Sequence, residues 1–263
     1  MQRENIYGIN TVISLLKVNA GNRKIFEILI NKNRKSQARI NEIINLANLK
    51  KISLRFIEND EFLNLSSLNQ ASSVSQGVIA NVSSYNHPDL KSDIKKIRNN
   101  LRQDIKNYNK KVIFAILDGI TDEGNFGAIL RNCSAFGVDG VIIPKNRSVS
   151  VTSRVSRISS GALEEVKVYN VTNLINAIKV LKDNGFWVYG TSLGNKYKLI
   201  QADTADYVFP IALVFGSEHK GISRIVEKNC DFLIKIPLLG KMQSLNVAVC
   251  TGIMFYIVCT YKK

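Results

Sequence analysis

The chain has little cysteine and almost no histidine. Its 263 residues include four cysteines, none of them in a CxxC pair, and two histidines, His87 and His219. Structural zinc sites need clustered Cys and His ligands, and disulfide scaffolds need a high density of cysteines. We therefore expect no metal site and a reducing compartment.

A signal peptide and a long apolar segment are also missing. The N-terminal stretch MQRENIYGIN has no apolar core. The C-terminal run SLNVAVCTGIMFYIVCTY carries no charge, but Ser244, Asn246, Thr251 and Thr260 interrupt it. That leaves it short of the ~20 apolar residues of a membrane span. These features predict a cytoplasmic protein without a membrane partner, ending in a helix that is buried on most sides.

Two nucleotide-binding fingerprints are absent from the sequence. It contains no GxxxxGK[ST] motif, which disfavours hydrolysis of nucleoside triphosphates by a P-loop. No GxGxxG follows a strand-like run, so an ordinary dinucleotide site or Rossmann-type methyltransferase site lacks its signature. A nicotinamide oxidoreductase would fit an α/β pattern but not this absence.

Acidic residues are the minority among the charges. Lys and Arg total 36 against 21 Asp and Glu, which gives a net charge of +15. Such a surplus suits a polyanion, nucleic acid first and an anionic membrane second. A biased genome, rich in Lys, Asn and Ile codons, is the alternative explanation.

The chain divides into two α/β regions. Residues 1–85 alternate helix-like and strand-like patterns and predict a small domain. Residues 86–110 are polar and basic and predict a linker with an amphipathic helix, whose lysines are typical of a solvated face. The apolar positions of that helix are Ile94, Ile97, Leu101 and Ile105. A second domain, residues 111–263, begins with the apolar strand KVIFAILDGI and predicts a mostly parallel sheet with helices on both faces.

The first candidate site follows that strand, where parallel sheets collect ligands. The stretch LDGITDEGNFGAILRN holds turn residues and then a helix that we expect to begin near Phe126. Arg131 lies four residues after Gly127, so both share one helix face. A ligand could approach there, although an ordinary solvated arginine fits the same spacing.

Two later strands end in similar junctions. LVFGSEHKGIS places Gly216 and Glu218 in a loop of small residues, which is either a cofactor loop or a simple turn. IKIPLLGKMQSLNVAV places Ser244 and Asn246 at the start of an apolar helix. Ser244 fits a helix N-cap, whereas a buried Asn246 amide would need hydrogen-bond partners.

A basic, serine-rich segment lies between Asp139 and Glu164 and contains no acidic residue. Its arginines are Arg147, Arg154 and Arg157. Arginines and hydroxyls in a loop suit contacts with phosphate, and a mobile polar loop is the alternative.

Together, NFGAILRN, LVFGSEHKGIS and IPLLGKMQSLNVAV resemble the three signature motifs of the SpoU (TrmH-like) family of RNA ribose 2'-O-methyltransferases. IYGINTV and SQGVIANV are similar to the ends of that family's small RNA-binding domain, and RISSGALEEVKV to the segment between the first two motifs. The resemblance covers nearly the whole chain. Close relatives have His where this chain has Ser75, which puts RNA contacts at that position in doubt.

This resemblance implies S-adenosylmethionine as methyl donor, a homodimer, and a C-terminal domain threaded as a trefoil knot. The implied substrate is structured RNA, and the overall pattern is most similar to members that methylate a guanosine of bacterial 23S rRNA. A tRNA target is the alternative within the family. Outside it, the rival is a non-catalytic RNA-binding or ribosome-assembly protein.

Site residues follow by motif position. The implied catalytic residues are Asn125, Arg131, Glu218, Ser244 and Asn246. Those implied for the cofactor are Thr191, Gly216, Ile236 and Leu245, and those expected for RNA are Arg147, Arg154 and Arg157. The family proposal makes the arginine a base. Because a guanidinium stays protonated in proteins, we expect Arg131 to position the ribose and stabilise charge instead.

Overall fold

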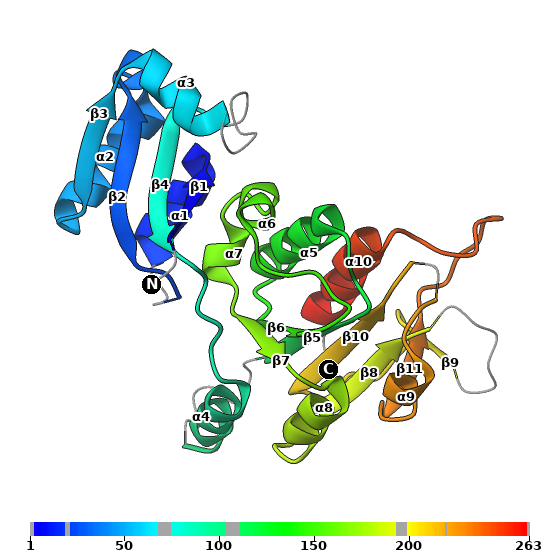
Figure 1. The fold of residues 1–263 in the computed structure, drawn as a ribbon. Coiled ribbons are helices and arrows are strands. Elements are labelled where there is room, and N and C mark those ends of the chain that lie inside the picture. The colour runs from blue at the N-terminus through cyan, green and yellow to red at the C-terminus, as the bar shows by residue number, and fades with distance from the viewer. Residues whose placement is uncertain are drawn as a thin grey trace. The chain divides into compact units, whose positions relative to one another are not determined.

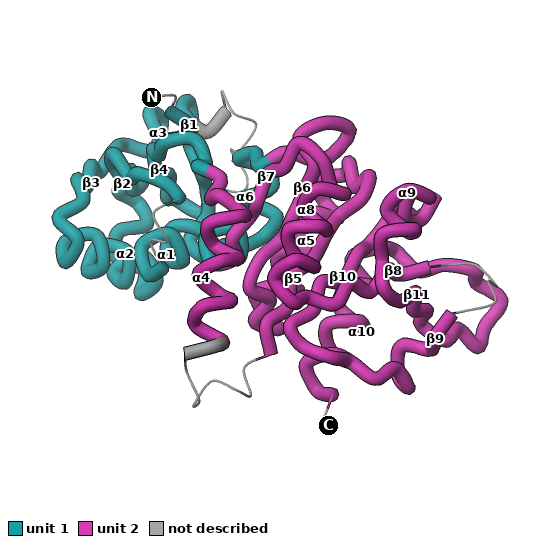
Figure 2. Tube along the Cα trace, turned by 90° about the horizontal axis from the view of Figure 1, so that it is seen from below, with its two compact units in different colours: residues 1–86, 151–165 teal, residues 87–150, 166–263 magenta. Residues whose placement is uncertain are grey.

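The structure is a computed structural model that describes residues 3–18, 22–67, 75–103, 111–192, 199–218 and 220–261. The chain forms two compact units (Figure 2). Unit 1 comprises residues 1–86 and 151–165, and unit 2 comprises residues 87–150 and 166–263. Both units contain a sheet covered by helices, so the predicted α/β class is confirmed.

Unit 1 is built on a mixed four-stranded sheet. Its strand order is β1 (Arg3–Tyr7), β4 (Val78–Ser83), β2 (Ile25–Asn31) and β3 (Ser53–Ile57). Helices α1 (Ile9–Val18) and α2 (Ala38–Leu49) share one apolar core with the sheet. Helix α3 (Asn59–Ser67) buries Phe62 against the opposite face, and a short 3-10 turn, η1 (Lys32–Arg34), follows β2. Both faces of the sheet are therefore covered at its centre, where β4 is buried along nearly its whole length.

The serine-rich segment completes unit 1. Helix α6 (Ser153–Ile158) packs against β1, and α7 (Ala162–Glu165) packs against α1. Ser156 and Ser159 are buried, so the predicted open loop is wrong for this part of the segment. The apolar Val155 and Leu163 drive the burial, a signal that the run of hydroxyls obscured in the sequence.

Unit 2 is built on a seven-stranded sheet in which every paired strand is parallel. Its order is β7 (Val168–Val171), β6 (Gly140–Pro144), β5 (Ile113–Asp118), β10 (Ile211–Gly216), β8 (Trp187–Thr191), β11 (Phe232–Lys235) and β9 (Leu199–Gln201). The uninterrupted apolar run of β5 places it inside the sheet, between β6 and β10, where both faces are covered.

Helices cover both faces of this sheet, as predicted (Figure 1). Helices α4 (Leu90–Gln103), α8 (Leu174–Lys182) and the short α9 (Arg224–Glu227) lie on one face. Helices α5 (Glu123–Ala135) and α10 (Val247–Thr260) pack together on the other. The predicted linker helix is α4, and Ile105 lies outside the described residues.

Helix α10 is buried on most sides but not on all. Met254, Phe255 and Val258 are buried against the sheet and α5. Val249 and Tyr256, two turns apart, are 51% and 60% exposed. Within the described part of the chain, no helix is both long and apolar enough to cross a membrane.

Candidate active site

The three motif loops meet at one edge of the unit 2 sheet. Strands β5, β10 and β11 are parallel and end at Asp118, Gly216 and Lys235. Their carboxyl ends therefore open onto the same side, which is where ligands bind in sheets of this kind.

A hydrogen-bond network joins the three loops. The Nδ2 group of Asn125 donates to Oε1 of Glu218 at 2.9 Å. The Nδ2 group of Asn246 donates to Oδ1 of Asn125 at 2.9 Å and to Oε1 of Glu218 at 2.5 Å. Three of the five residues predicted to be catalytic thus contact one another across long sequence separations, and a carboxylate that accepts two amide donors is firmly oriented.

Asn125 is placed by the start of helix α5. The carboxylate of Asp122 accepts a hydrogen bond from the backbone N–H of Asn125 at 2.7 Å and caps the helix. The helix therefore begins at Glu123 rather than near Phe126, because Asp122 supplies the cap. Asn125 consequently lies in the first helical turn, where its side chain has one defined direction.

Asn246 is the N-cap of helix α10. Its Oδ1 accepts hydrogen bonds from the backbone N–H groups of Ala248 at 2.9 Å and Val249 at 3.4 Å. The prediction of Ser244 as the cap is wrong, because α10 begins at Val247. The Asn246 amide is also exposed rather than buried. Both ends of this amide are nevertheless occupied, so its orientation is fixed.

The second loop is closed tightly upon itself. A Cβ atom on Gly216 would lie 1.9 Å from the carbonyl carbon of Gly221, so only glycine fits. The backbone N–H of Gly221 donates to Ser217 O at 2.8 Å. The Asp118 carboxylate, at the end of β5, accepts the N–H of Ser223 at 2.7 Å. Asp118 had only the appearance of a turn residue in the sequence, yet it tethers the loop that carries Glu218.

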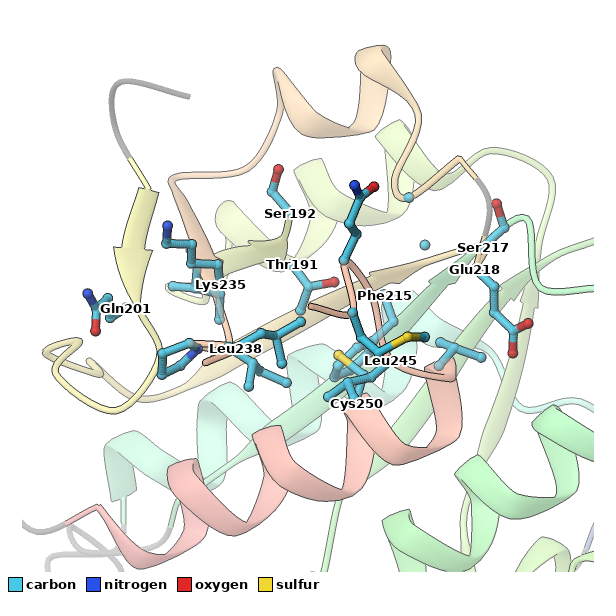
Figure 3. Close-up of a pocket in the computed structure, with 18 of the residues that line it drawn as sticks. Thr191, Ser192, Gln201, Phe215, Ser217, Glu218, Lys235, Leu238, Leu245 and Cys250 are labelled. Carbon is cyan, nitrogen blue, oxygen red and sulfur yellow. The ribbon is translucent and has the colours of Figure 1, made fainter. Parts of the chain in front are cut away.

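A cavity of about 420 Å³ opens beside the network. Its lining includes all four residues predicted for the cofactor: Thr191, Gly216, Ile236 and Leu245. In Figure 3, Lys235 and Gln201 lie toward one end, Glu218 lies toward the other, and Leu245 lies between. The sequence did not single out Lys235 or Gln201, because β9 and β11 meet only in the folded sheet.

Arg131 lies outside the cavity lining. It is exposed on α5, and its guanidinium has no ion pair or hydrogen bond among the described residues. Gly127, on the same helix face, is buried. Ser244 is half-buried, two residues before the α10 cap. Neither Arg131 nor Ser244 joins the amide network.

The arginines expected to contact RNA do not form one group within either unit. Arg147 is exposed in unit 2, whereas Arg154 and Arg157 belong to α6 of unit 1. Ser75 is only 3% exposed, which leaves little of it available to RNA. The neighbouring Gln76 accepts the N–H of Ile9 at 2.9 Å.

Metal-binding side chains do not cluster in the part of the chain that is described: no group of three or more His, Cys, Asp or Glu side chains could hold an ion there. His219 lies outside the described residues. Burial raises the pKa of Cys250, which lines the cavity, to about 11, so its thiol is neutral at pH 7.

Comparison with known families assigns both parts of the chain. Residues 112–256 match the SpoU rRNA Methylase family, and residues 5–88 match the family described as RNA 2'-O ribose methyltransferase substrate binding. These matches define an RNA methyltransferase with a substrate-binding domain. The chain belongs to the SpoU rRNA methylase family.

Two relatives that align with most of the chain are also named as RNA methyltransferases. A protein of Staphylococcus saprophyticus named as a TrmH family tRNA/rRNA methyltransferase is 40% identical over 220 residues, covering 84% of this chain and 82% of that protein. YacO of Bacillus subtilis, named likewise, is 34% identical over 263 residues, 100% of this chain and 96% of its own.

Solved structures share the fold. The SpoU methyltransferase AviRb from Streptomyces viridochromogenes, in complex with AdoMet, superposes with a TM-score of 0.73. The match is 18% identical and covers 98% of this chain and 89% of that one.

Proposed function

We propose that the protein transfers the methyl group of S-adenosylmethionine to a ribose 2'-hydroxyl in structured RNA, with a guanosine of 23S rRNA as the target. The observation that carries the proposal is the Asn125–Glu218–Asn246 network beside the cavity. It brings amide and carboxylate groups from three distant motifs to a pocket of ligand size.

The cavity suits this cofactor chemically. Apolar side chains such as Leu238 and Leu245 offer a surface for a flat base, while the negative charge of Glu218 is complementary to that of a sulfonium cation. Gly216 lines the cavity through backbone atoms alone and lets Gly221 and Ile222 pack directly against it. AviRb and an rRNA methyltransferase of Sinorhizobium meliloti were both solved with AdoMet bound, which supports the same ligand here.

Protein groups would act mainly by positioning. The bound cofactor supplies an electrophilic methyl group, and the ribose hydroxyl must be aligned with it and stabilised as its proton leaves. Arg131, whose guanidinium is exposed and has no partner among the described residues, would bind the ribose and the adjoining phosphate. Asn125 would orient the ribose, and Glu218 and Asn246 would hold Asn125 in place. Ser244 would keep the third loop near the reacting groups.

Ribosomal RNA is favoured over tRNA by the extent of the structural matches. The Sinorhizobium meliloti rRNA methyltransferase covers 98% of this chain with a TM-score of 0.72 at 21% identity. The tRNA modifying enzyme of A. aeolicus covers 65%, with a TM-score of 0.51 at 28% identity. The curated relatives carry tRNA and rRNA together in their names, so the target needs a direct test.

The active form would be a homodimer. Val249 and Tyr256 form an exposed apolar stripe on α10, a helix whose opposite side, with Met254, Phe255 and Val258, is buried. Such a stripe suits a second copy of the same surface. Light scattering of the wild type and of Tyr256→Glu tests this. A carboxylate in the apolar contact would destabilise the dimer, so the variant should be a monomer.

Methylation mapping tests the activity. Purified protein and labelled S-adenosylmethionine are incubated with 23S rRNA and with tRNA from cells that lack the gene, and 2'-O-methyl positions are mapped. We expect one guanosine of 23S rRNA to be labelled. Label in tRNA alone would show that the target is tRNA and not 23S rRNA. Cofactor binding without label in either RNA would refute the proposal.

A further inference from the structure

Helix α4 belongs to neither family match. The matched segments are residues 5–88 and 112–256, and α4 spans Leu90–Gln103 between them. It is nevertheless a folded part of unit 2, because Leu90 and Ile94 are buried in the core beneath α8 and the sheet. A role for its outer face is therefore not covered by either family.

Polar contacts fix this helix to its unit. Oδ2 of Asp93 accepts from Nζ of Lys167 at 2.8 Å and from the hydroxyl of Tyr169 at 3.0 Å. Arg98 donates to the backbone carbonyl of Asp183, at the C-terminal end of α8, at 3.3 Å. These contacts hold α4 in a defined orientation on unit 2.

The outer face of α4 is basic. Lys91, Lys95 and Lys96 are all exposed. Lys91 and Lys95 are one helical turn apart, and neither ammonium group has an ion pair among the described residues. The nearby carboxylates have other partners: Asp93 pairs with Lys167 at 2.8 Å and with Lys96 at 3.7 Å, and Asp89 accepts the N–H of Ser92 at 2.8 Å.

Folding alone does not favour this arrangement. Like charges at i and i+4 destabilise a helix by about 0.2–0.5 kcal/mol. Lys91 also lies in the first turn, where the helix dipole favours an acidic side chain. A polyanionic partner that neutralises both ammonium groups would remove these costs.

We propose that the outer face of α4, centred on Lys91 and Lys95, binds phosphates of the RNA substrate. It would add affinity without base recognition, as phosphate contacts do. This inference depends on the proposed function for the identity of the RNA. It adds an RNA-contacting surface on unit 2 to those expected of the substrate-binding domain and the three motif loops.

Salt dependence of RNA binding tests the proposal. The double variant Lys91→Gln/Lys95→Gln is compared with wild type by filter binding to a 23S rRNA transcript between 50 and 300 mM KCl. Losing two phosphate contacts should lower the slope of log K against log salt by roughly 1.4–1.8 and weaken binding roughly 25- to 60-fold at 0.1 M. Methylation at saturating RNA and affinity for S-adenosylmethionine should stay unchanged.

The matched control is Lys91→Arg/Lys95→Arg, which keeps both charges and should bind like wild type. An unchanged slope in the Gln variant overturns the proposal, as does equal weakening in the Arg variant. Phosphatidylserine vesicles that pellet wild type but not the Gln variant, with RNA binding unchanged, would assign the face to a membrane and also overturn it. Absence of methylation by wild type would refute the proposed function and leave the salt slope measurable.

Discussion

Asn246 donates its side-chain amide to the carboxylate of Glu218 at 2.5 Å, while its carbonyl oxygen accepts the backbone N–H of Ala248 at 2.9 Å. One side chain therefore begins helix α10 and also fixes the group that orients Asn125. We therefore expect Asn246 to serve both stability and catalysis, and mutation can separate the two roles.

Substituting Asn246 by Ser and by Ala separates the two roles. Serine can still cap the helix, so Asn246→Ser should stay within about 0.5 kcal/mol of wild type, whereas Asn246→Ala should lose roughly 1 kcal/mol. Both remove the donor to Glu218 and should lower the methylation rate on the order of 100-fold. Urea unfolding and single-turnover methylation measure the two effects. A Ser variant with wild-type turnover would show that the amide network is not needed for catalysis.

Arg131 should be dispensable for folding and required for turnover. It is exposed and makes no ion pair within the part of the chain that the structure describes, so Arg131→Ala should change stability by less than about 0.5 kcal/mol. Cofactor affinity should be retained, because Arg131 does not line the cavity, while methylation should be abolished. Arg131→Lys, which keeps the charge but not the planar fork, should recover only part of the rate. Calorimetry measures cofactor affinity, and methylation assays measure turnover. Normal turnover by the Ala variant would show that Arg131 is not required for catalysis.

Much of the fold could be predicted from periodicity. The apolar run before Asp118 predicted an interior parallel strand, and the structure places β5 inside an all-parallel sheet. Helical spacing of Ile94, Ile97 and Leu101 predicted α4. These patterns are local, so the sequence alone carries them.

Features that depend on distant partners could not be predicted in this way. Ser244 and Asn246 both fit an N-cap by residue type, and only the contacts with Asn125 and Glu218 explain why Asn246 takes the position. The burial of Ser156 depends on the packing of α6 against β1 within unit 1, which no local pattern shows. Lys235 lines the cavity because β11 pairs with β9, a pairing that the sequence does not show.

Gly216 should be irreplaceable by alanine. A Cβ there would lie 1.9 Å and 2.1 Å from backbone atoms of Gly221 and Ile222, so the loop must shift. Gly216→Ala should cost ~3 kcal/mol of unfolding free energy and abolish binding of S-adenosylmethionine. Gly240→Ala is the control in the third loop, since nothing lies within 4 Å of its added Cβ. Calorimetry and thermal unfolding measure both variants, and wild-type cofactor affinity in Gly216→Ala would contradict the geometry.

Arg23 should be the most sensitive charged residue of unit 1. Its side chain is fully buried, forms ion pairs with Glu4 and, at 3.2 Å, with Glu164, and donates to the Ser83 carbonyl at 3.0 Å. Burial raises the pKa of Glu164, which is itself 4% exposed. Arg23→Met would leave that carboxyl without its partner, and breaking such a pair costs about 3–5 kcal/mol.

The unfolding free energy that Arg23→Met loses should depend on pH, and the direction of that dependence can be stated. Without Arg23, the folded-state pKa of Glu164 rises further above its unfolded value, so the folded state binds the proton more tightly. Stability then falls as pH rises through the interval between the two values. Arg23→Met should therefore be more destabilising at pH 8 than at pH 5 in urea unfolding. Adding Glu164→Gln should remove most of that difference, since an amide has no proton to lose; an equal loss at both pH values would show that Arg23 acts through packing rather than through its charge.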